Sequence, residues 1–237
     1  MTLTERQRRI LNKIIEEHID SAEPVSSSLL EEKYDFGICP ATIRIEMRKL
    51  TSAGLITQPH TSAGRIPTDK GYRFYVNELL EENLTNENID LWVTDEEIEE
   101  IKDTIKFLQS LTKNLASISS NLAIGYLFKE KILLKEGWEE ILKEPEFQEK
   151  KLISNFTNLL KVFEEEIENL KINSGIKIFI GKENPFFKVR DFSIILSKCH
   201  FPETDEGVLA LLGPKRMTYE KNISSLSSII KLVENLG

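Results

Sequence analysis

The chain has 237 residues, a length that favours one small domain followed by a larger one. Its 40% apolar and 30% charged residues allow a buried core and exclude a disordered acidic chain, and its formal net charge of −8 argues against a uniformly basic protein that coats nucleic acid. The charge is unevenly spread, because residues 1–76 carry +1, residues 77–170 carry −12 and residues 171–237 carry +3.

The first residues of the chain predict two helices. Thr4 and Gln7 form a capping-box pattern, and apolar residues follow at helical spacing, so we expect a first helix from about Thr4 to Ile19. The chain restarts at Pro24-Val25-Ser26, and the second helix is expected to be short and to end near Lys33.

A third helix is predicted for residues 40–53. Pro40 suits its first turn, and Gly54 is a typical residue just past a helix end. Apolar residues recur at i, i+4 and i+7, so this stripe must face the core; its members are Ile43, Met47 and Leu50. The opposite face then holds the polar and cationic side chains of Thr42, Arg44, Arg48 and Lys49.

A hairpin is predicted directly after the third helix. Leu55–Gln58 has the composition of a strand, residues 59–64 form a turn-rich loop, and Arg65–Pro67 is the expected return strand. Three helices followed by a hairpin is the element order of a winged helix-turn-helix. A further helix is expected from Thr68, and the polar residues 83–94 are interpreted as a linker.

The remainder of the chain predicts acidic helices followed by a small mixed α/β unit. Apolar residues keep helical spacing over residues 98–115 and 152–170, and these helices are expected to pack within the chain or against a second subunit. Alternating patterns predict strands at 176–180, 192–199 and 208–212, and a closing helix is expected over 223–236.

The third helix has the charge pattern of a helix that enters DNA. The major groove, about 12 Å wide, admits one α-helix whose polar face points outward while its apolar stripe holds it to the protein. Arg44 and Arg48 are four residues apart and share a face, so each can pair with guanine or with a phosphate. Thr42 is placed to meet a base edge or a thymine methyl group. The alternative is an ordinary helix with a solvated face.

The hairpin adds groups of the kind that contact phosphates. Hydroxyls, amides, backbone N–H groups and arginines make most such contacts, and Gly64 allows the loop to approach another surface closely. For His60 taken alone, the alternative is an exposed loop histidine without a task. The candidate contact residues of the hairpin are Gln58, His60, Thr61, Ser62 and Arg65.

The sequence indicates no catalytic, cofactor or metal site. His18, His60 and His200 lie in separate elements without metal-ligand spacing, and neither a glycine-rich phosphate loop nor a nucleophile elbow occurs. The two cysteines, Cys39 and Cys199, are far apart and suggest neither a disulfide framework nor a metal knuckle. We therefore expect a protein that is not an enzyme and uses no cofactor.

The composition favours a cytoplasmic protein without a membrane partner. The first 15 residues lack the features of a secretory signal, and no apolar stretch approaches the ~20 residues that cross a bilayer. Lys215 and Arg216 allow two interpretations, an anion site or a surface turn before the last helix, and the second is favoured.

Several motifs carry a family resemblance. The stretch Gln58–Arg73, QPHTSAGRIPTDKGYR, closely resembles the signature of the HrcA family of bacterial heat-inducible transcription repressors, as does Ala41–Arg44 with Glu46-Met47 in the third helix. Supporting similarities occur at Leu142–Phe147, at Gly181–Asn184, and at Gly213–Met217 followed by Tyr219. Two positions depart from the family pattern: Pro40, where a small polar residue is usual, and Ile45, where asparagine is frequent.

The resemblance implies a dimeric repressor. HrcA proteins bind an inverted-repeat operator upstream of chaperone genes, and their active form depends on a GroEL-type chaperonin that heat diverts to unfolded chains. They carry a winged helix, a GAF-like domain and an inserted dimerising domain, and this chain is shorter than typical members. We therefore expect an α+β fold, with a winged-helix DNA-binding domain at 1–82, a linker at 83–94, and an acidic helical, partly GAF-like regulatory and dimerisation domain at 95–237.

Two hypotheses of function follow. The first is a sequence-specific repressor of heat-shock genes that binds an inverted repeat in double-stranded DNA as a homodimer and is modulated by the chaperonin. The second is a winged helix that serves as a protein-interaction module, with the acidic helices as a scaffold. Replacement of Arg44 and Arg48 by alanine separates them, because only the first hypothesis predicts a loss of DNA binding.

Overall fold

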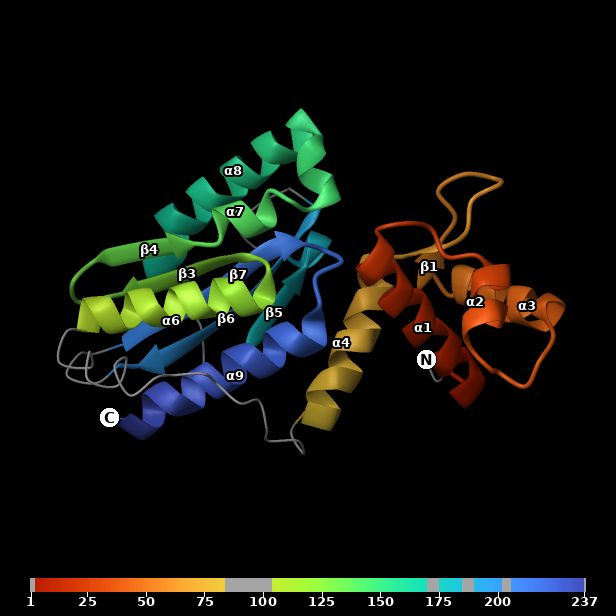
Figure 1. The fold of residues 1–237 in the computed structure, drawn as a ribbon, viewed down its shortest axis with the longest axis horizontal. Coiled ribbons are helices and arrows are strands. Elements are labelled where there is room, and N and C mark those ends of the chain that lie inside the picture. Colours follow the sequence, from red (N-terminus) through yellow and green to blue (C-terminus); the bar gives the residue numbers. More distant parts are fainter. Residues whose placement is uncertain (1–2, 84–103, 170–174, 185–189, 202–205, 237) are drawn as a thin grey trace. The chain divides into compact units, whose positions relative to one another are not determined.

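The chain divides into two compact units. The computed structural model describes residues 3–83, 104–169, 175–184, 190–201 and 206–236, and the two units are Met1–Leu84 and Thr85–Gly237 (Figure 1). Of the predicted linker 83–94, Asn83 is the last residue of a helix and the rest lies outside the described residues. The predicted helical positions at 98–103 also lie outside them.

The first unit contains the predicted helices and hairpin. In chain order its described elements are α1 (Glu5–Ser21), α2 (Ser27–Lys33), α3 (Pro40–Ser52), β1 (Ile56–Thr57), β2 (Ile66–Pro67) and α4 (Asp69–Asn83). The capping box of α1 is confirmed, because the Gln7 N–H donates to Thr4 Oγ1 at 3.2 Å and the Thr4 N–H donates to Gln7 Oε1 at 3.1 Å. The unit closes on a core in which Ile14, Leu30 and Ile43 are fully buried.

The second unit is built on a five-stranded antiparallel sheet with the strand order β4-β3-β7-β6-β5. Its strands are β3 (Leu122–Leu127), β4 (Ile132–Glu136), β5 (Lys177–Ile180), β6 (Phe192–His200) and β7 (Glu206–Pro214). Its helices are α6 (Thr104–Ser119), α7 (Trp138–Ile141), α8 (Lys150–Glu166) and α9 (Tyr219–Leu236), with short 3₁₀ turns η2 (Pro145–Gln148), η3 (Ile167–Asn169) and η4 (Gly181–Glu183). The predicted strands β5, β6 and β7 and the closing helix are thereby confirmed.

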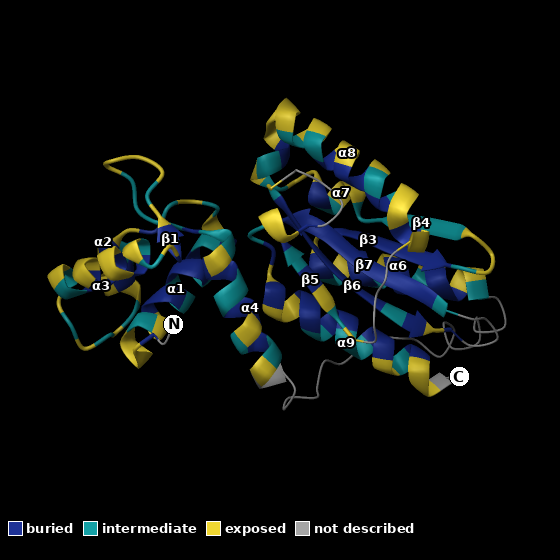
Figure 2. Ribbon diagram, turned by 180° about the vertical axis from the view of Figure 1, so that it is seen from behind, coloured by how far each residue is buried: buried dark blue, intermediate teal, exposed yellow. Residues whose placement is uncertain are grey.

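Helices cover both faces of this sheet. Helices α6 and α9 lie on one face, and α7 and α8 lie on the other (Figure 1). Gly125 faces α6, since a Cβ there would lie 2.4 Å from Thr112 Oγ1. The other face meets an aromatic cluster, in which the Phe156 ring centroid lies 5.0 Å from those of both Phe147 and Phe192. The sheet is therefore the buried middle layer of the unit, with exposed residues on the outer sides of the helices (Figure 2).

One expectation about the middle of the chain is wrong. The sequence pattern predicts helices but no strands between residues 95 and 170, whereas β3 and β4 form a hairpin between the two predicted helices. All six residues of β3 are buried, since the strand is covered on both faces, and such a strand lacks the alternation that signals a half-exposed strand. The α+β class is confirmed, while the middle segment contributes two strands of the sheet.

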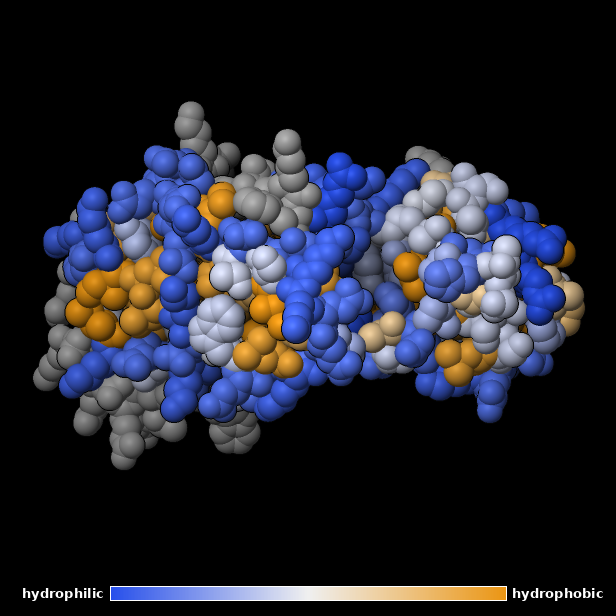
Figure 3. Space-filling model, turned by 90° about the horizontal axis from the view of Figure 1, so that it is seen from above, coloured by the Kyte–Doolittle hydropathy of each residue, from blue (hydrophilic) through white to orange (hydrophobic). Residues whose placement is uncertain are grey.

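The surface is mostly hydrophilic on the face drawn in Figure 3, with apolar side chains gathered in separate areas. None of the described helices combines the length and the hydropathy that a membrane span requires. Cys199 is buried in β6, and burial raises the pKa of its thiol to about 12, as expected for a small core residue.

Candidate nucleic-acid interface

Helix α3 turns its apolar stripe inward and its cations outward. Ile43, Met47 and Leu50 are buried, while Arg44, Arg48 and Lys49 are exposed and Thr42 is half-buried near the N-terminal end. This is the orientation that the i, i+4, i+7 spacing predicts. A role of these four residues in binding stays a prediction.

The three cations of α3 differ in how far the protein engages them. The Arg48 side chain makes no hydrogen bond or ion pair with any residue that the structure describes. Arg44 Nη2 lies 3.4 Å from Ser27 Oγ on α2, a long contact that leaves its other donors available. Lys49 Nζ pairs with Glu46 Oε1 at 2.9 Å. Two arginines with spare donors thus face solvent from one helix.

Glu46 anchors α3 to the body of the unit. Its side chain is buried and also accepts a 2.9 Å hydrogen bond from Gln7 Nε2 on α1. The hydrogen bond from Lys49, together with that from Gln7, outweighs burial and holds the pKa of the Glu46 carboxyl below its ordinary value. Glu46 therefore stays charged near neutral pH and helps fix the face that α3 presents.

The tip of the hairpin is exposed, but the side chains of two predicted contact residues of the hairpin, Gln58 and Arg65, form hydrogen bonds within the protein. His60, Thr61 and Ser62 are exposed. Gln58 is folded back, because its Nε2 donates to the carbonyls of Thr61 and Ala63 at 2.9 Å each. Gln58 therefore braces the loop, and its amide donors are occupied in this arrangement.

Arg65 connects the hairpin to α3. Its Nε donates to Thr51 Oγ1 at 3.2 Å, and the side chain is half-buried. The structure thus brings the base of the hairpin beside the C-terminal part of α3. Part of the Arg65 guanidinium is committed to this internal contact.

Gly64 allows a close approach, as expected, but to the protein's own backbone at Val25. A Cβ at this position would lie 2.4 Å from the carbonyl oxygen of Val25, so only glycine fits against that backbone. Beside it, Val25 and Arg65 exchange two backbone hydrogen bonds of 2.9 and 2.8 Å. The surface that Gly64 approaches closely is therefore the chain segment before α2.

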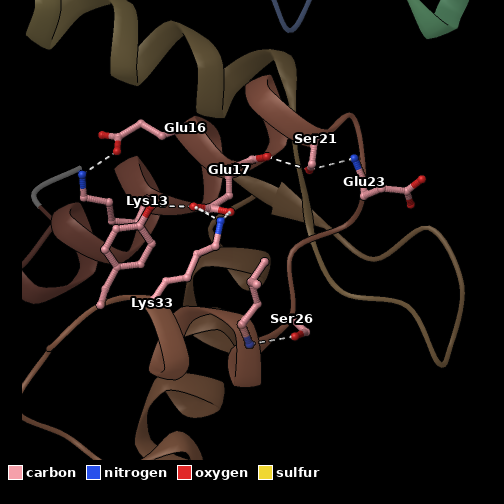
Figure 4. A network of polar contacts seen from close by, with 9 residues as sticks. Lys13, Glu16, Glu17, Ser21, Glu23, Ser26 and Lys33 are labelled. Carbon is pink, nitrogen blue, oxygen red and sulfur yellow. Dashed lines mark hydrogen bonds and ion pairs between the residues drawn. The ribbon is translucent and has the colours of Figure 1, made fainter.

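A buried glutamate on α1 holds the end of α2 in place. Glu17 accepts hydrogen bonds from Lys33 Nζ at 2.7 Å and from the Tyr34 hydroxyl at 2.6 Å (Figure 4). The contacts from Lys33 and then Tyr34 outweigh burial and lower the pKa of Glu17, and its carboxylate raises the pKa of Tyr34 to about 12. Sequence reasoning missed Glu17, because a single acidic residue in an amphipathic helix is ordinarily solvated.

Other chemistry is weakly supported by the same region. No three His, Cys, Asp or Glu side chains gather as a metal site within the described ranges. Cys39 is exposed at the N-cap of α3, where the hydrogen bond with Thr42 lowers the pKa of its thiol.

These features define the class of protein as an α+β chain of two units. The first unit is mainly helical and presents a cationic helix beside a hairpin, and the second unit is an antiparallel sheet covered by helices. The family model "HrcA protein C terminal domain" matches residues 72–223. The chain therefore belongs to the HrcA family, as the motifs indicated.

Curated relatives and a solved structure agree with this assignment. The chain is 27% identical over 340 residues to the heat-inducible transcription repressor HrcA of Thermoanaerobacter sp. (strain X514), with 100% of this chain and 97% of that protein covered. It is 29% identical over 330 residues to the protein of the same name from Natranaerobius thermophilus, with 97% and 95% covered. A crystal structure of a hypothetical protein matches with a TM-score of 0.82 at 21% identity, covering 99% of this chain and 98% of the other, which shows the shared fold.

Proposed function

We propose that this chain is a cytoplasmic transcription repressor that binds an inverted repeat in double-stranded DNA as a homodimer. In this proposal the first unit is a winged helix-turn-helix, α3 enters the major groove, and the hairpin lies on the adjacent backbone. The names of the curated relatives support the repressor role. The second unit, as a GAF-like sheet, would join the two subunits and carry the regulation.

The observation that carries the proposal is the outward face of α3. Arg44 and Arg48 are exposed one helical turn apart, and the helix is backed by a buried apolar stripe and by the anchored Glu46. A helix whose apolar face is packed on the protein and whose cationic face is exposed to solvent can enter a groove without losing its packing. The exposed hydroxyls of Thr61 and Ser62 supply groups that suit phosphate oxygens.

The first experiment tests operator binding. Duplexes are selected from a random pool with the full chain, and binding is then measured by gel shift for the selected duplex and for a scrambled one at moderate salt. We expect a preference for a two-fold symmetric sequence, and a loss of about 1–3 kcal/mol for each base-reading arginine in Arg44→Ala and Arg48→Ala. Lys143→Ala is the matched control, because Lys143 is an exposed cation of the second unit paired with Glu140.

Equal affinity for the selected and the scrambled duplex would overturn the proposal. If each subunit neutralises about three or four phosphates, the dimer's affinity should also fall with salt at a log–log slope of about −5 to −7. Retention of a protein partner by the double variant, together with an absence of any DNA preference, would favour an interaction module instead.

Modulation by a GroEL-type chaperonin is a separate part of the proposal and comes from the family resemblance. We expect the chaperonin with ATP to raise the fraction of the purified chain that binds the selected duplex. The measurement is the active fraction, obtained by titrating a fixed amount of protein with duplex well above its dissociation constant. An unchanged active fraction would remove the chaperonin from the mechanism and leave DNA binding intact.

A further inference from the structure

The outermost line of α3 is not formed by its arginines alone. The positions farthest from the core follow each other at i, i+4, i+7 and i+11, and all four are exposed; they are Ala41, Ile45, Arg48 and Ser52. Ile45 is 50% exposed and is the one large apolar side chain so exposed among the described residues of the first unit. An apolar strip thus occupies the first two turns of the helix.

Cations surround this strip. Arg44 precedes Ile45, and Arg48 and Lys49 follow it by one turn, so they border it on the helix surface. The major groove has a matching arrangement, because phosphates line its edges while the C5-methyl of thymine is the apolar group that bases present inside it. Residues in the N-terminal half of a recognition helix are the ones that reach base edges. Packing in the protein core does not account for an isoleucine at position 45, because half of its surface is exposed.

We propose that Ile45, supported by Ala41, packs against the C5-methyl group of a thymine in each half-site and so selects thymine at that position. This inference rests on the proposed function, since it requires α3 to lie in the major groove. Ile45 cannot exchange hydrogen bonds with a base edge, so its discrimination comes from the methyl group. Arg48, on the same line one turn later, supplies the neighbouring polar contact.

The test removes only the methyl group. Each thymine of the selected duplex is replaced in turn by deoxyuridine, and the affinities of the full wild-type chain and of Ile45→Ala are measured at constant salt. We expect one symmetry-related pair of positions at which the wild-type affinity falls by about fourfold per half-site, the effect of one buried methyl group. Ile45→Ala should bind the thymine duplex more weakly by at least that factor and should be indifferent to the replacement.

The outcomes separate this inference from the proposed function. If wild type selects no duplex, both are overturned. Two results would overturn only the role of Ile45. In the first, Arg48→Ala weakens DNA binding while deoxyuridine changes the wild-type affinity at no position; in the second, the affinity of Ile45→Ala still falls when thymine is replaced by deoxyuridine. Ile105→Ala is the matched control, because Ile105 is a 41% exposed isoleucine on α6 of the second unit, and its removal should leave affinity and methyl sensitivity unchanged.

Discussion

Arg48 in the first unit and Arg216 in the second show opposite uses of the same side chain. Arg48 is exposed on α3 and has no polar partner among the residues that the structure describes. The Arg216 side chain is 10% exposed and pairs with Glu144 and Glu146. The two arginines differ because carboxylates about seventy residues away in sequence pack against Arg216, while none pairs with Arg48 in the described structure. Residue type alone therefore does not distinguish an arginine that is open to a ligand from one that stabilises the fold.

The Arg216 pair joins two segments of the second unit. Its Nε lies 2.7 Å from Glu146 Oε1 and its Nη2 lies 2.9 Å from Glu146 Oε2, so the guanidinium is gripped at two points, and Glu144 adds a third contact. Burial opposes its charge, but the two carboxylates raise the pKa of Arg216 above its ordinary value. Residues 215–216 form a turn before α9, as the favoured interpretation predicted. The Arg216 side chain is held by this protein's own carboxylates, so the alternative of an anion site gains no support.

The largest effect is expected when Arg216 is removed. Arg216→Ala should lower the free energy of unfolding of the second unit by about 2–4 kcal/mol, because two partly buried carboxylates lose their partner. Urea unfolding can be followed by the fluorescence of Trp138, which packs on Phe156, in a Trp92→Phe background. Lys143→Ala removes an exposed pair and should cost less than about 1 kcal/mol. Equal costs for the two variants would refute the contrast drawn between buried and exposed pairs.

Glu17 supplies an intermediate case within the first unit. Its lowered pKa means that the stabilisation by Lys33 and Tyr34 is fully present above the unfolded-state pKa of about 4.3 and is lost as the pH falls through the folded-state pKa. Glu17→Gln should therefore destabilise the unit by about 1–2 kcal/mol at pH 7, with the gap closing as the pH falls below about 4.

Amide hydrogen exchange in peptides from α1 measures this gap, after correction for the intrinsic pH dependence of exchange. Glu16→Gln is the matched control, because Glu16 pairs with Lys13 on a more exposed part of the same helix. A gap between wild type and Glu17→Gln that stays constant from pH 7 to acid would show that the ion pair with Lys33 contributes nothing.

The smallest effect on stability is expected for Arg48→Ala. Because Arg48 lacks a partner in the described structure, its loss should change the free energy of unfolding by less than about 0.5 kcal/mol while weakening DNA binding. The same urea and exchange measurements apply. A substantial loss of stability would place Arg48 with Arg216 among the structural arginines.

Periodicity predicted the elements that have one solvated face. The stripe of Ile43, Met47 and Leu50 was enough to orient α3 and hence to expose its cations. Strand β3 could not be found in this way, since both its faces are covered and its pattern is continuous. Contacts between distant segments were equally hidden: neither the closeness of Gly64 to Val25 nor the pairing of Arg216 with Glu146 has a local signal.

Ile45 marks the limit of sequence reasoning at the candidate site. Its departure from the family pattern was visible, but apolar residues of an amphipathic helix ordinarily face the core, so the sequence did not suggest that an isoleucine would be 50% exposed on the outward face. Conversely, the motif that contains Gln58 and Arg65 was conspicuous, yet the structure gives both side chains internal partners. A sequence motif therefore identifies the region of a candidate site more reliably than it identifies the role of each residue in it.

The backbone bridge between Val25 and Arg65 has a mechanical consequence. Main-chain hydrogen bonds tie the base of the loop to the segment before α2, and Arg65 ties it to α3, so this base cannot move away from α3 without breaking both attachments. If α3 lies in the major groove as proposed, a hairpin held in this way would adapt little to a duplex of the wrong shape, and the DNA would have to bend or change its groove width instead. Flexible base steps outside the contacted positions would then influence which sites are occupied.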